Sequence, residues 1–162
     1  MTGVQTCALP ISASSVVHAL RMRRYHTLKT FDDPLVWILH AGYGWLIIGL
    51  GLLSLTGLRL LEIPAVIHAL TAGCIGSMIL GMICRVTLGH TGRELKAGHL
   101  TALSFFAIQI AALMRVFGPL LMPGYITEWI IGSAVLWGGC YGIYLWAYTP
   151  MLFATRPDGQ IA

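Results

Sequence analysis

Four long apolar runs constrain this chain more than any other feature of its sequence. They lie at residues 34–56, 64–88, 100–121 and 126–153. Each exceeds the roughly 20 residues that an α-helix needs to cross a lipid bilayer. None alternates with a period of two, which argues against the strands of a membrane barrel. The runs therefore predict an all-α membrane protein, with a bundle of four transmembrane helices over residues 34–156.

The composition supports a protein whose main solvent is the lipid bilayer. Only 10% of the residues are charged and 57% are hydrophobic, whereas soluble domains carry about 25% charged residues. Three cysteines, Cys74, Cys84 and Cys140, lie inside apolar runs without the spacing of a metal finger. We interpret them as small buried hydrophobic residues, and we expect no nucleic-acid partner.

The basic residues predict how the chain is oriented in the membrane. Four spans place eight of the ten Lys and Arg residues on one side of the bilayer: Arg21, Arg23, Arg24, Lys29, Arg85, Arg93, Lys96 and Arg156. The opposite side has only Arg59 and Arg115. Because cytoplasmic loops are enriched in Lys and Arg, we expect the C-terminal tail, residues 157–162, to be cytoplasmic. In a bacterium the membrane would be the inner one.

The N-terminal region carries two separate predictions. Residues 1–11 lack the basic start and apolar core of a signal peptide, and GVQTCALPI within them resembles a translated sequencing adapter. We interpret them as an artefact and exclude them from the fold. Residues 12–33 are predicted to form a basic cytoplasmic loop. Because residues 1–11 are interpreted as an artefact, we expect the chain to be the C-terminal piece of a longer protein.

Glycines are frequent within the runs, and their role is open on sequence alone. They let helix backbones approach closely, and they also leave room for a flat ligand against a helix. The segments Gly44–Gly51 and Gly138–Gly142 are candidate breaks of the kind found in transporter helices.

Two polar residues point to a site near the outer face. His68 lies about one turn into the second run, and Arg115 lies about 22 Å along the third run, so both are at one level. A neutral imidazole is a common haem ligand, and an arginine fork suits carboxylates such as haem propionates. A haem site at His68 and Arg115 is one interpretation. Glu128 is the competing partner of Arg115, and an interfacial histidine bonded to a backbone carbonyl or to water is the alternative for His68.

A second group of polar residues lies near the cytoplasmic face. His40 is about 9 Å into the first run and is followed by Tyr43, whereas His90, Arg93 and His99 surround the turn after the second run. Histidines gathered at one face suit copper, and a solvated basic loop is the alternative. Arg85, at the end of the second run, suits a side chain that snorkels to the interface.

These segments carry a family likeness. DPLVWILHAGYGWLIIGL, HALTAGCIGSMILGMICRVTLGHTGREL and LMRVFG resemble the C-terminal part of the NnrS family. The resemblance implies an inner-membrane protein of about twelve spans that contains haem and copper and responds to nitric oxide. It also implies that the partners of these four helices include N-terminal transmembrane helices of the same protein that are missing from this chain. The family-like positions are His40, Tyr43, His68, Arg85, His90, Arg93 and Arg115.

The resemblance does not say which residue binds which group. From depth and chemistry we assign metal binding to His68, His40 and His90. We assign cofactor contacts to four further residues, Arg115, Arg85, Arg93 and Tyr43. Two other functions stay open: a transporter whose buried His and Arg line a substrate path, and a nitric oxide reductase-like haem–copper enzyme. A haem spectrum separates the transporter from the rest, and catalysed loss of nitric oxide identifies the enzyme.

Overall fold

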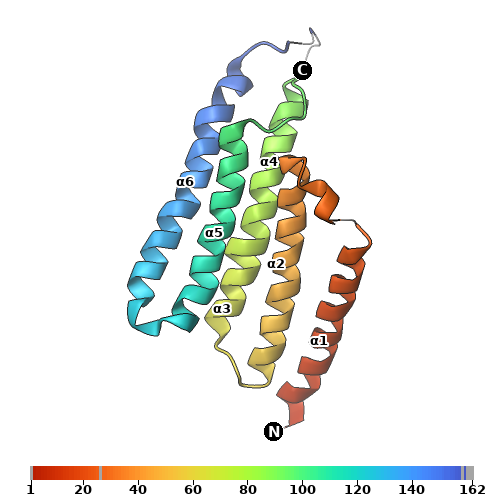
Figure 1. The fold of residues 1–162 in the computed structure, drawn as a ribbon, viewed down its shortest axis with the longest axis vertical. Helices are drawn as coiled ribbons and strands as arrows, with labels where there is room; N and C mark the ends of the chain where they lie inside the picture. Colours follow the sequence, from red (N-terminus) through yellow and green to blue (C-terminus); the bar gives the residue numbers. More distant parts are fainter. Residues whose placement is uncertain (1, 26, 158, 160–162) are drawn as a thin grey trace.

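The computed structural model describes residues 2–25, 27–157 and 159, and all secondary structure in them is helical (Figure 1). In chain order the elements are α1 (Thr2–Arg23), η1 (Thr27–Thr30), α2 (Pro34–Gly57), α3 (Ile63–His68), η2 (Ala69–Ile75), α4 (Gly76–His90), α5 (His99–Leu121), η3 (Pro123–Tyr125) and α6 (Ile126–Phe153). The element η2 is a π-helix, and η1 and η3 are short 3₁₀ turns.

The four predicted spans are confirmed. Helices long and apolar enough to cross a membrane cover Pro34–Gly57, Ile63–His90, His99–Leu121 and Pro123–Phe153. The first begins as its sequence dictates, because Asp33 caps it by accepting the Leu35 N–H at 2.9 Å while Pro34 occupies the first turn. Short connections make successive spans antiparallel, so α2 and α5 begin at the end of the bundle where α4 and α6 finish (Figure 1).

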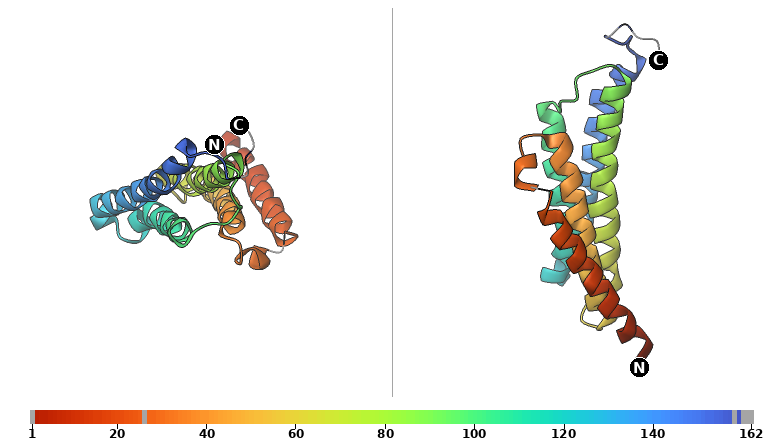
Figure 2. Two further views of the ribbon diagram at one scale, coloured as in Figure 1. Left: turned by 90° about the horizontal axis from the view of Figure 1, so that it is seen from above. Right: turned by 90° about the vertical axis from the view of Figure 1, so that its right-hand side faces the viewer.

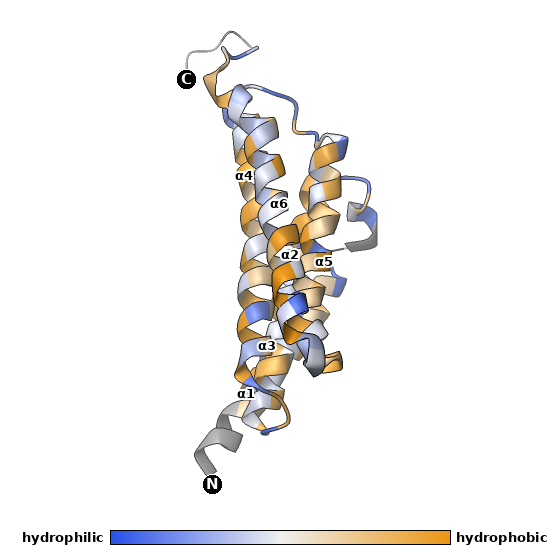
Figure 3. Cartoon of the chain, turned by 90° about the vertical axis from the view of Figure 1, so that its left-hand side faces the viewer, coloured by the Kyte–Doolittle hydropathy of each residue, from blue (hydrophilic) through white to orange (hydrophobic). Residues whose placement is uncertain are grey.

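The bundle is elongated in cross-section, with α1 and α6 at its opposite edges and α2 and α4 between them (Figure 2). Its core includes Leu35 and Ile38 of α2, Leu80 of α4, and Phe105 and Ile108 of α5, all fully buried. Figure 3 shows hydrophobic residues along the length of the helices. Many large apolar side chains are exposed, among them Ile79, Phe106 and Val135, as expected where lipid is the solvent.

A polar chain crosses this core at mid-depth. The Trp45 Nε1–H of α2 donates to Gln109 Oε1 of α5 at 2.9 Å, and Gln109 Nε2 donates to Ser77 Oγ of α4 at 2.9 Å. Three helices are therefore joined by hydrogen bonds where no water competes for them.

The glycines divide into two groups. In the α2–α4 region several are sites of close packing: a Cβ at Gly49 would lie 2.4 Å from Leu70, and one at Gly73 would lie 2.4 Å from Trp45. In α6 the glycines Gly138, Gly139 and Gly142 have no such neighbour within 4 Å. Both candidate breaks are wrong, because α2 and α6 remain α-helical through them. The irregular segment is η2 instead.

The prediction of a loop over residues 12–33 is wrong for its first half. Residues 12–23 belong to α1, which packs along α2 (Figure 1). Side chains at three-residue spacing join the two helices: Ser12 bonds Ser54 (2.6 Å), Ser15 donates to the Ile47 carbonyl (2.9 Å), and His18 Nδ1 bonds the Tyr43 hydroxyl (2.6 Å). A helix whose contact face is polar lacks the apolar run by which the four spans are recognised.

Residues 2–11 form the first part of the same helix. Ala8 accepts hydrogen bonds from Ser12 and Ser54 through its backbone carbonyl, a group that any residue in that place would provide. The interpretation of residues 1–11 as a translated adapter stays a prediction.

Candidate cofactor sites

The π-helix η2 interrupts the second span directly after His68. A π segment inserts a residue into the α-helical hydrogen-bond ladder and is common at functional sites. At its end the Gly76 carbonyl accepts a hydrogen bond from the Tyr141 hydroxyl of α6 at 2.9 Å. Trp45 packs over Gly73 and Trp137 over Gly76, so the irregular turn is fixed from two sides.

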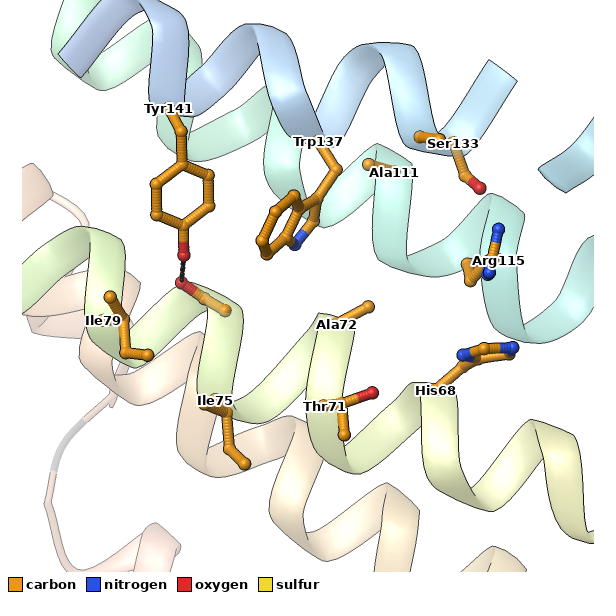
Figure 4. A pocket seen from close by; sticks show the side chains of 12 residues that line it. His68, Thr71, Ala72, Ile75, Ile79, Ala111, Arg115, Ser133, Trp137 and Tyr141 are labelled. Carbon is orange, nitrogen blue, oxygen red and sulfur yellow. Dashed lines mark hydrogen bonds between the residues drawn. The ribbon is translucent and has the colours of Figure 1, made fainter. Parts of the chain in front are cut away.

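A cavity of about 540 Å³, here the first cavity, lies against this segment between α5 and α6 (Figure 4). Its volume is within the range of about 300–1,000 Å³ that is usual for small-molecule and cofactor sites. The wall is mainly apolar. The lining residues are His68, Thr71, Ala72, Ile75, Gly76, Ile79, Ala111, Arg115, Ser133, Ala134, Trp137 and Tyr141.

The structure places His68 and Arg115 at one end of the first cavity, where their side chains lie close together (Figure 4). Arg115 Nη1 donates to the Ile130 carbonyl at 3.3 Å. Within the described residues no carboxylate forms an ion pair with Arg115, so Glu128 does not neutralise it. The guanidinium charge is therefore available to an anion that enters the cavity.

His68 is half-buried at the start of η2. In the part of the chain that the structure describes, its imidazole has no protein hydrogen-bond partner. No backbone carbonyl among the described residues accepts a hydrogen bond from His68, and a histidine bonded to water stays the alternative. The neutral form of an imidazole is the one that binds iron.

A second cavity of about 340 Å³ lies between α1, α2 and α4. His40 and Tyr43 line it together with His18, which sequence reasoning missed because it lies in the segment read as a loop. The Tyr25 and His40 rings meet edge-on with centroids 6.3 Å apart. The spacing of Ser12, Ser15 and His18 is the signal that would have placed His18 on a helix face. The lining residues are His18, Arg21, Met22, Tyr25, Leu39, His40, Tyr43 and Met78.

A third cavity of about 410 Å³ lies where α4 ends. It contains Arg85 and His90 of the predicted set, and its lining residues are Met82, Arg85, Val86, Gly89, His90, Leu95 and Arg156. Arg93 lies outside it and donates to the Thr91 and Met151 carbonyls, both at 3.4 Å, which joins the turn to α6.

The predicted gathering of His40 with His90 and His99 is wrong. His40 lines the second cavity and His90 the third, and among the described residues no three His, Cys, Asp or Glu side chains are grouped for a metal ion. The turn between α4 and α5 is instead a charged, exposed surface, in which the Glu94 carboxylate 2.6 Å from Lys96 raises the pKa of the Lys96 ammonium.

Comparison with known proteins gives one positive finding. A family model described as NnrS protein matches residues 2–156, nearly the whole chain. No curated protein and no solved structure matches the chain.

Proposed function

The chain belongs to the NnrS family, and we propose that it is a haem- and copper-binding membrane protein that acts in the response to nitric oxide. Family membership supports both cofactors. The observation that carries the proposal is the pairing of His68 and Arg115 in one apolar cavity beside a π-helix.

The residues of the first cavity fit haem. His68 would provide the imidazole ligand, and Arg115 would bind a propionate through its guanidinium fork. The apolar wall, with Trp137 at its centre (Figure 4), would exclude water from the site. When bound, haem supplies an iron atom to which nitric oxide binds. Arg85 and Tyr43 line other cavities, so we do not assign them to the same group.

The second cavity fits copper by the chemistry of its donors. His18 and His40 offer imidazoles, and Met22 and Met78 offer thioethers. Cu(I) favours soft sulfur ligands, and imidazole suits copper in both oxidation states. His90 shares its cavity with no second histidine. We therefore place copper at His18 and His40.

The first prediction tests the haem proposal. The 162-residue chain, purified in detergent with haem supplied during expression, will show a Soret band, and adding nitric oxide to the reduced protein will shift it. Folded protein without a band would overturn the proposal and favour the transporter interpretation. Sustained loss of nitric oxide with a reductant present would instead identify the reductase-like enzyme.

The second prediction tests the copper site. His18→Ala and His40→Ala will each weaken Cu(I) binding at least about tenfold, since even the removal of an outer-shell partner has that effect. The measurement is competition with a chromophoric Cu(I) chelator. His90→Ala is the matched control and will leave the affinity unchanged. A loss in His90→Ala alone would contradict the assignment.

A further inference from the structure

The third cavity has a charge pattern that the proposed function does not use. Two arginines and a histidine line it, Arg85, His90 and Arg156, and the lining residues that the structure describes include no carboxylate. The cavity lies at the end of α4, close to where α6 ends and the tail begins. Such a pocket is complementary to a compact anion.

Its walls are apolar on the side that continues along the membrane span. Val86 lies one turn and Met82 two turns before His90 on the same face of α4, and each is 46% exposed. Gly89, between Val86 and the end of α4, has no side chain to fill the cavity. A Cβ at Gly89 would meet only Leu95, at 3.9 Å. The site therefore has a charged end at the helix terminus and an apolar groove leading from it into the hydrocarbon region.

We propose that the third cavity binds an anionic phospholipid. Arg85 and Arg156 would bind the phosphodiester, with His90 as a further donor, and an acyl chain would lie along Met82 and Val86. Basic pockets between transmembrane helices bind anionic headgroups in this way, and an arginine fork suits phosphate oxygens. A free phosphate ion would use the charged end alone and would leave the exposed apolar groove uncovered. This inference does not depend on haem or copper.

The experiment measures lipid binding to the full 162-residue chain in detergent. Phosphatidylglycerol, phosphatidylcholine and glycerol phosphate are added separately, and bound lipid is counted by native mass spectrometry beside the thermal unfolding temperature. We expect phosphatidylglycerol to bind and to raise the unfolding temperature, and phosphatidylcholine to do neither. Arg85→Gln and Arg156→Gln will each weaken phosphatidylglycerol binding about fivefold, as one basic residue contributes near an anionic lipid.

Two variants keep the test decisive. Arg156 follows the last residue of α6, so Arg156→Gln changes the site without changing a span. Arg59→Asn removes a charge at the other end of the bundle, where the positive φ of 60° tolerates asparagine, and will bind phosphatidylglycerol normally. Equal binding of both lipids, equal weakening by Arg59→Asn, or full protection by glycerol phosphate would each overturn the proposal.

Discussion

Replacing His68 with alanine will remove the Soret band of the haem-loaded chain, and replacing His40 or His90 will leave it. The three histidines line three different cavities. The first cavity combines a volume of about 540 Å³ and a mainly apolar wall with the pairing of its imidazole and Arg115, whose guanidinium no described carboxylate neutralises. The loss is large because haem without the imidazole of His68 would keep only apolar and propionate contacts. The measurement is the reduced-minus-oxidised spectrum at equal protein concentration.

Arg115 provides the matched test of the same cavity. Arg115→Gln keeps the ligand and removes the charge that would bind a propionate, so the band will persist while haem dissociates faster into excess apomyoglobin. His68→Ala and Arg115→Gln should unfold at about the wild-type temperature in their haem-free forms, because neither side chain belongs to the buried core. A full band in His68→Ala would show that the iron ligand lies elsewhere.

The sequence predicts the spans because apolar runs of this length have few alternatives. Pro34–Gly57, for example, is found within one residue of its predicted end. The sequence also predicts that His68 and Arg115 lie at one level, because position along a helix converts directly into height. Position along a helix determines height only. His40 and His90 both lie toward the same end of the bundle but face different neighbours, and rotation about the axis depends on packing.

Two features of the sites were beyond sequence reasoning for separate reasons. The segment ALTAGCI of η2 has ordinary helical composition, and the structure packs Gly73 of this segment against Trp45 and the following Gly76 against Trp137. The helix α1 is not predicted from the sequence because its contact face consists of serines and His18. These side chains form hydrogen bonds with α2 and do not add to an apolar run. Hydropathy does not detect a helix that is held by hydrogen bonds.

The second large effect is expected at Gly73, where the packing around η2 is tightest. In Gly73→Ala the new Cβ would lie 2.4–2.8 Å from three ring atoms of Trp45. The indole is rigid, and its Nε1–H is held by Gln109, which in turn bonds Ser77. Relief therefore requires a backbone shift or the loss of the polar chain. Overpacking costs about 1–3 kcal/mol, and a hydrogen bond between membrane helices contributes about 0.6 kcal/mol.

The measurement is the free energy of unfolding from mixed micelles, with Gly138→Ala as the matched control. Gly138 lies in a transmembrane helix too, but a Cβ there meets nothing within 4 Å, so that variant will keep the wild-type stability or gain a little from helix propensity. If both variants behave alike, the close approach of η2 to Trp45 does not determine stability. If Gly73→Ala alone is destabilised and its haem band also weakens, the same contact that stabilises the bundle also sets the position of His68, five residues before it.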